Sequence, residues 1–213
     1  MTRNEMRKRV QMMLGEWGGT DGARNPLQLD TWVTAACDEL SRATDAYYLR
    51  DIADIAADQI EYCAPEVYKV MAIYARDQSG ETRTLSPMTP QQMDRISRIW
   101  RSNPASGPPA FYIAEGTNRF RLYPVPNYDS PNGLTVEGYM VPASGWDGDN
   151  DECPLPLVAH MGVVFGACRL RIAEMPSPEN MARLPLIERM YQESRTRLER
   201  EVATRTDATR RHA

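Results

Sequence analysis

Side chains suited to proton transfer are scarce in this sequence, which contains two histidines, His160 and His212. Histidine ordinarily titrates near neutral pH, so it is the first candidate for acid–base chemistry. His160 lies in an apolar segment without an HExxH-type partner, which favours a packed or interface residue, and His212 lies in the polar tail. No serine occupies a G-x-S-x-G turn, and no glycine-rich phosphate loop follows a predicted strand. We therefore predict that the chain has no catalytic residues and is not an enzyme.

The cysteines are the next candidates, because paired thiolates bind zinc or exchange disulfides. None of the four is part of a C-x-x-C pair, which both kinds of site would need: Cys37, Cys63, Cys153 and Cys168. We expect reduced, buried or half-buried side chains in a protein made and kept in a reducing cytoplasm.

An acidic segment before a proline offers the one candidate metal site. Asp147, Asp149 and Asp151 alternate as in the first half of a calcium-binding loop. However, Glu152 stands where that loop needs glycine, and Val158 stands where it needs a bidentate glutamate. We predict a solvated loop whose negative charge suits the start of the following helix, with no metal ion and no cofactor.

Arginines dominate the end of the chain, together with a few carboxylates: Arg195, Arg197, Arg200, Arg205, Arg210 and Arg211. One interpretation is a solvated helix face with i,i+4 ion pairs and a loose end. The other is a segment that becomes ordered on docking to a partner, with the arginines as anchors. The sequence leaves both open.

Composition narrows the function classes further. The chain has 213 residues and a formal net charge of −4, so no global positive field attracts nucleic acid. Its longest apolar stretch, Leu155 to Cys168, is too short to cross a bilayer and runs into Arg169. We therefore expect neither a free-standing DNA-binding protein nor a membrane protein.

Helical periodicity appears at both ends of the chain. We predict helices over about 4–17, 29–44 and 155–174, and a last helix with Pro185 as a candidate break, before a tail (204–213) that would be disordered alone. Gly18, Gly19 and Gly22 predict a flexible link after the first helix. In the apolar fourth segment, Leu157 and Val158 should face inward, and Gly162 and Gly166 allow close helix packing inside the subunit or across an interface.

The middle of the chain favours strands. We predict a hairpin over 47–65, a strand over 67–75, a possible short strand at 83–85, and strands at 111–114, 119–123 and 134–141. A short helix should start after Thr89 and direct four apolar residues inward: Met93, Ile96, Ile99 and Trp100. The predicted fold class is α+β, with a bundle of N- and C-terminal helices (1–46 and 154–213) and an inserted, mostly β module (47–153).

This layout resembles the head-to-tail adaptor (connector) proteins of tailed bacteriophages. The resemblance covers most of the chain and is carried by four stretches: Leu29 to Thr44, Glu61-Tyr62-Cys63-Ala64-Pro65, Met93 to Tyr112, and Phe120-Arg121-Leu122-Tyr123-Pro124-Val125-Pro126 with Leu134 to Pro142. It implies a structural virion protein that forms a dodecameric ring under the portal, extends the DNA channel and helps to retain the genome. It also implies assembly in the host cytoplasm and a place in the neck.

The implied partners are the portal protein, neighbouring copies, a downstream tail or nozzle protein, and double-stranded DNA that passes without specific binding. By the same resemblance, the C-terminal helix and tail form the portal-docking extension: Leu198, Val202, Arg205, Arg210 and Arg211. Two loops would contact a neighbour or the next ring: Gly116, Thr117 and Asn118, and Asn127, Tyr128, Asp129 and Asn132. Alternatives are another neck, tail-completion or nozzle subunit, or a small enzyme of unknown type.

Overall fold

The computed structural model describes residues 1–15, 26–142, 146 and 148–210. Within these residues the fold is α+β, with five α-helices and two four-stranded sheets, so the predicted class is confirmed. The chain divides into two compact units. The helical unit comprises Met1–Tyr47 and Val141–Ala213, and the strand unit comprises Tyr48–Met140.

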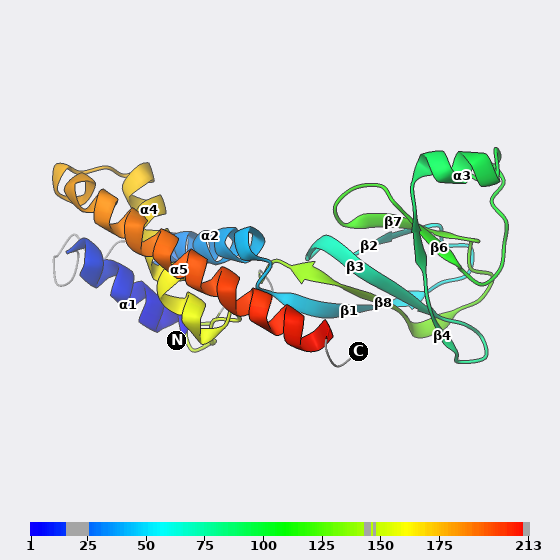
Figure 1. Cartoon of the computed structure of the whole chain (residues 1–213), viewed down its shortest axis with the longest axis horizontal. Helices are drawn as coiled ribbons and strands as arrows, with labels where there is room; N and C mark the ends of the chain where they lie inside the picture. Colours follow the sequence, from blue (N-terminus) through cyan, green and yellow to red (C-terminus); the bar gives the residue numbers. More distant parts are fainter. Residues whose placement is uncertain (16–25, 143–145, 147, 211–213) are drawn as a thin grey trace. The chain divides into compact units, whose positions relative to one another are not determined.

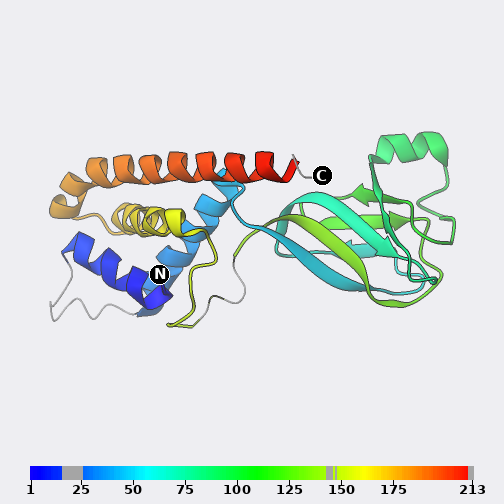
Figure 2. The ribbon, with the colours of Figure 1, turned by 60° about the horizontal axis from the view of Figure 1, so that its bottom comes forward.

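The helical unit is organised around one apolar helix. Its elements are α1 (Arg3–Leu14), α2 (Pro26–Thr44), the 3-10 helix η1 (Leu157–Ala159), α4 (His160–Glu174) and α5 (Pro178–Arg210). Helix α4 packs on α1, α2 and α5, and Figure 2 shows it between α5 and α1. Ten of its residues are buried, which explains why its sequence is apolar on nearly every side.

Helix α1 is capped at both ends. Thr2 and Glu5 form a reciprocal capping box at its start, and Gly15 ends it with a left-handed φ of 72°. The helix therefore ends at Leu14, before the predicted end at about residue 17, because Gly15 leaves helical geometry. The predicted link at Gly18, Gly19 and Gly22 lies outside the described residues.

The start of the fourth predicted helix differs from the expectation. The α-helix begins at His160, and Leu157, predicted to face inward, is 79% exposed in the preceding 3-10 turn. Pro154 and Pro156 explain the difference, because proline lacks an N–H group and disfavours helical geometry in the residue before it.

The glycine pair of α4 makes close contacts inside the helical unit. A Cβ added at Gly166 would lie 3.0 Å from Ala36 Cβ and 3.2 Å from Tyr191 Cε2. At Gly162 it would lie 3.1 Å from side-chain atoms of both Leu40 and Ser194. The predicted close packing is therefore confirmed, with α2 and α5 as the partners.

Helix α5 is continuous from Pro178 to Arg210, so the suggested break at Pro185 and the predicted disordered tail from residue 204 to 210 are both wrong. Pro185 removes only the hydrogen bond to the Met181 carbonyl, on an exposed stretch where water can replace it. Towards the end of the helix, Arg205 pairs with Glu201 one turn earlier. Residues 211–213 lie outside the described residues.

The strand unit contains two sheets (Figure 1). The first has the order β1-β8-β3-β4, formed by Tyr48–Ile55, Ser130–Met140, Val67–Arg76 and Thr82–Thr84. The second has the order β2-β7-β6-β5, formed by Glu61–Cys63, Arg119–Tyr123, Phe111–Ala114 and Ser86–Met88. The strands predicted at 67–75, 111–114 and 119–123 are confirmed, and β8 begins four residues before the predicted 134.

The predicted hairpin over 47–65 is wrong, although both of its strands exist. Strand β1 pairs with β8 in one sheet, and β2 pairs with β7 in the other. The intervening residues carry the chain between the sheets through Asp58, whose φ is 60°. Alternation of side chains predicts a strand but does not specify its partner.

The short helix α3 (Pro90–Ile96) starts as predicted, with Thr89 and Gln92 in a capping box. Met93 and Trp100 are buried, but Ile96 and Ile99 are 57% and 55% exposed, so the inward prediction is wrong for these two. The reason is that the helix ends at Ser97 in extended geometry, so later residues do not continue its periodicity. Trp100 lies beyond the helix but is buried, and its Nε1 donates a hydrogen bond to Asp94.

Candidate functional site

His160 is fully occupied by structural hydrogen bonds. The backbone nitrogen of Met1 donates to its Nδ1 at 2.7 Å, and its Nε2 donates to the carbonyl of Leu155 at 3.0 Å. The side chain is 7% exposed. Because both ring nitrogens have protein partners, the interpretation of His160 as a satisfied packed residue is confirmed.

Two distant cysteines meet in the core of the helical unit. The Cys37 thiol donates to Cys153, which lowers the pKa of Cys153 to about 5 and raises the pKa of Cys37 well above its usual value. Both residues are buried. Sequence spacing gave no signal of this pairing, because α2 and the segment before η1 come together only on folding. All four cysteines are free, as predicted, but Cys63 is exposed, because on β2 only Tyr62 points inward.

The carboxylates of the acidic loop bind different partners. Asp149 pairs with Arg7, and Asp151 accepts a hydrogen bond from the backbone of Gly148 at 2.7 Å. Asp147 lies outside the described residues. Within the described part of the chain, no group of three or more His, Cys, Asp or Glu residues could hold a metal ion.

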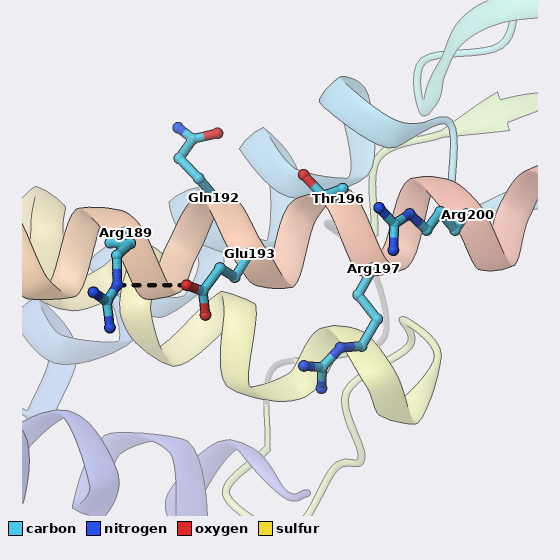
Figure 3. Close-up of a pocket in the computed structure, with 6 residues that line it drawn as sticks. All are labelled: Arg189, Gln192, Glu193, Thr196, Arg197 and Arg200. Carbon is cyan, nitrogen blue, oxygen red and sulfur yellow. Dashed lines mark ion pairs between the residues drawn. The ribbon is translucent and has the colours of Figure 1, made fainter.

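The outward side of α5 forms an open, mostly polar groove (Figure 3). Six residues spaced three or four apart line it: Arg189, Gln192, Glu193, Thr196, Arg197 and Arg200. Arg189 pairs with Glu193 at 3.4 Å, whereas Arg197 and Arg200 have no carboxylate partner among the described residues. The groove therefore carries excess positive charge that is free to pair with an acidic surface.

The predicted docking residues of α5 lie in different environments. Leu198 is fully buried, Val202 packs partly against the core, and Arg205 is exposed beside Glu201. The side chain of Arg210 and the whole of Arg211 lie outside what the structure describes. The sequence analysis included Arg197 and Arg200 among the candidate anchor arginines, but the portal-docking set implied by the resemblance left them out. Their position on the helix side opposite Leu198 could have identified them.

The first predicted contact loop is the tip of the β6–β7 hairpin. Gly116 and Thr117 are exposed and border a groove whose other walls are aromatic and cationic: Tyr68, Lys69, Tyr112 and Arg119. Lys69 Nζ lies 4.9 Å from the centre of the Tyr139 ring, where a cation is favoured. Asn118 is half-buried, and its carbonyl accepts from the backbone of Ala64 at 2.9 Å.

The second predicted contact loop is joined to the end of β1. The backbone of Asn132 donates to Asp54 at 2.7 Å, and Asp129 accepts from the backbone of Ala57 at 2.8 Å. Asn127, Asp129 and Asn132 are exposed. Tyr128 is buried and donates its hydroxyl to the carbonyl of Arg76 at 3.1 Å, so it holds the loop from inside.

Comparison with known proteins gives one result. A family model described as SU10 adaptor protein matches residues 1–213, and no curated protein matches the chain. The match confirms the resemblance to phage head-to-tail adaptors that the sequence suggested. Among the described residues, every helix is too short or too polar to cross a membrane.

Proposed function

The chain belongs to the SU10 adaptor protein family, and on this premise we propose that it forms a ring joining the portal of a phage particle to its tail. The observation that carries the proposal is the family match over the whole chain. In keeping with a structural role, three residues that could do chemistry are engaged internally: His160 in hydrogen bonds, and Cys37 with Cys153 in the core.

Docking to the portal is assigned to the outer side of α5 and its end. Arg197 and Arg200 present guanidinium groups without internal carboxylate partners, and Arg205, Arg210 and Arg211 continue the basic character along the chain. Arginine binds carboxylates in a bidentate manner and is common at the centres of protein interfaces. The expected portal surface is therefore acidic.

A closed ring requires two different surfaces on each subunit. In this proposal the helical unit forms the wall, and the strand unit presents the exposed residues of its two loops to a neighbour or to the next ring: Gly116, Thr117, Asn127, Asp129 and Asn132. The net charge of −4 suits a conduit, because a wall without excess positive charge lets double-stranded DNA pass without specific binding.

The test is binding to purified portal rings of the same virus, measured by co-sedimentation. Three variants are compared with the full chain: truncation after Ala203, Arg197→Glu with Arg200→Glu, and a control, Glu81→Ala with Arg83→Ala, which removes an exposed ion pair of the strand unit and leaves the net charge unchanged. We expect the full chain and the control to bind, the charge reversal to weaken binding by at least about tenfold, equivalent to ~1.4 kcal/mol, and the truncation to weaken it too.

Two results would contradict the proposal in different ways. Equal binding of the charge-reversed, truncated and full-length proteins would remove α5 as the docking element. Failure of the full chain to bind the portal, with binding to a tail or nozzle protein instead, would place it elsewhere in the neck.

A further inference from the structure

The end of α3 exposes apolar and basic side chains together. Ile96 and Ile99 are more than half exposed, and Arg95 and Arg98 beside them are exposed without a carboxylate partner among the described residues. Arg101 differs, because it pairs with Asp94. We call the four residues Arg95, Ile96, Arg98 and Ile99 the basic ridge. Exposed isoleucines among charges are typical of a protein contact more than of a solvated face.

The opposite chemistry occurs at the open edge of the first sheet. Within the described part of the chain, strand β1 has β8 on one side and no strand on the other, and its Ile52 is 54% exposed. Asp54, Asp58 and Asp129 add carboxylates that have no cationic partner among the described residues. We call Ile52, Asp54, Asp58 and Asp129 the acidic edge. An exposed sheet edge with an apolar residue is a site that proteins usually cover with another element.

The two surfaces carry opposite charges. Each combines exposed isoleucine with unpaired charge, positive on the ridge and negative on the edge. Both lie in the strand unit, and Figures 1 and 2 both draw α3 on the side of that unit away from β1. Two different, complementary surfaces on one unit can generate a head-to-tail contact, which closes into a ring when the rotation allows.

We propose that the basic ridge of one copy packs on the acidic edge of the next copy, so that α3 covers the open side of β1. This contact rests on the proposed ring and names the surfaces that build it. DNA is a poorer occupant of the ridge, because isoleucines gain nothing from phosphate contacts. A second copy is favoured over a different protein, since the same unit supplies both halves of the match.

Cysteine crosslinking tests the contact directly. The background variant is Cys63→Ser, because Cys63 is the exposed cysteine and the other three are buried. Ile52→Cys and Ile99→Cys are introduced singly and together, and each protein is treated with a short bismaleimide crosslinker, both free and after mixing with portal rings. Because the contact is head-to-tail, the double variant should give a ladder of covalent multimers, and each single variant alone should not extend beyond monomer. An equal mixture of the two single variants should stop at dimer.

Charge exchange provides an independent readout in the same assembly. Arg95→Glu with Arg98→Glu should reduce ring formation by at least about tenfold, and Asp54→Lys with Asp58→Lys should do the same. Combining all four substitutions in one chain should restore it, since each copy then supplies both reversed surfaces. Thermal melting of each variant shows whether the fold is kept.

The outcomes separate the two proposals. Rings visible by electron microscopy without a covalent ladder would overturn the ridge–edge contact and leave the adaptor proposal intact. A ladder from a chain that does not bind portal would support the contact and contradict portal joining. A basic-ridge variant that forms normal rings but loses a tail protein would assign the ridge to that protein and overturn the contact.

Discussion

At the scale of residues, partly buried polar and charged side chains on three helices of the helical unit contact one another. Arg169 pairs with Glu39, and its guanidinium carbon lies 4.8 Å from the centre of the Tyr191 ring. The Tyr191 hydroxyl donates to Glu39 at 3.2 Å. Burial, and then the Glu39 carboxylate, raise the pKa of Tyr191 to about 12, so the hydroxyl stays protonated and remains a donor. This cluster joins α2, α4 and α5.

Cysteine reactivity depends on two opposing properties, thiolate formation and access. The low pKa of Cys153 favours a reactive thiolate, but its side chain is buried, whereas Cys63 is exposed. We predict that solvent access determines which cysteine reacts, because a reagent must reach the sulfur atom. Iodoacetamide should add once to the folded protein, at Cys63, and four times in denaturant, as measured by mass spectrometry and peptide mapping. Labelling of Cys153 as fast as Cys63 in the folded protein would contradict this.

Glu137 accepts hydrogen bonds at the centre of the outer face of the first sheet. Arg50 donates to it at 2.5 and 2.9 Å, and the hydroxyls of Tyr48 and Tyr74 lie at 3.1 and 3.3 Å. Desolvation raises the pKa of Glu137, but the bonds from Arg50 and the tyrosines outweigh it, so the net shift is downward from 4.5. A lowered carboxyl pKa stabilises the folded state above the ordinary value, and the gain is lost as pH falls through the folded pKa.

Glu137→Gln should therefore lower the free energy of unfolding by about 1 kcal/mol at neutral pH, a modest value because Arg50 is largely exposed. The difference from the unsubstituted chain should shrink at an acidic pH below the lowered pKa of the folded Glu137 carboxyl, where the group itself is protonated. Urea denaturation at both pH values measures it, with Glu66→Gln as the control, since Glu66 has no ion pair among the described residues. The same loss at both pH values would show that charge plays no part.

At the scale of elements, the sequence predicted helices better than it predicted which strands pair. The capping residues Thr89 and Gln92 and the apolar period of 29–44 identify helices correctly, because both depend on neighbours within a few turns. The partners of β1 and β2 are specified by contacts with β8 and β7, far along the chain. No short pattern contains that information. Ile96 and Ile99 were misassigned for a related reason, because the end of α3 depends on where Ser97 turns.

Gly138 lies where strand β8 approaches strand β3 closely, so its substitution tests how these strands pack. A Cβ at this position would lie 2.4 Å from the carbonyl oxygen of Lys69 on the neighbouring strand β3. Gly138→Ala should therefore destabilise the protein by about 1–3 kcal/mol, as overpacking does elsewhere. The control is Gly116→Ala at the exposed hairpin tip, where no heavy atom lies within 4 Å of the added Cβ. Denaturation midpoints compare them, and equal midpoints would mean that β8 shifts freely away from β3.

The candidate surfaces were only partly predictable from the sequence. The two loops could be located, because their turn residues are local signals, but the burial of Tyr128 could not. Similarly, the arginines of the last helix were visible in the sequence, whereas the presence or absence of internal carboxylate partners emerged only from the fold. Ile96 and Ile99 of the basic ridge were predicted to face inward, and they became candidate interface residues because the structure exposes them.

At the scale of the whole molecule, the chain combines two units that each expose unpaired charge: Arg197 and Arg200 on the helical unit, and the basic ridge and acidic edge on the strand unit. Exposed charges without ion-pair partners destabilise a free subunit little, because water solvates them. They favour association when a partner supplies the opposite charge. This distribution suits a protein whose function lies in assembly, as membership of an adaptor family indicates.

The central claim is that copies of this chain form a ring directly below the portal. Electron cryo-microscopy of the intact particle tests it most directly. We predict a ring of this chain in the neck, with α5 against the portal and the α3 end of one copy against β1 of the next. A neck map in which the polypeptide is missing, or is present without contacting the portal, would contradict the account.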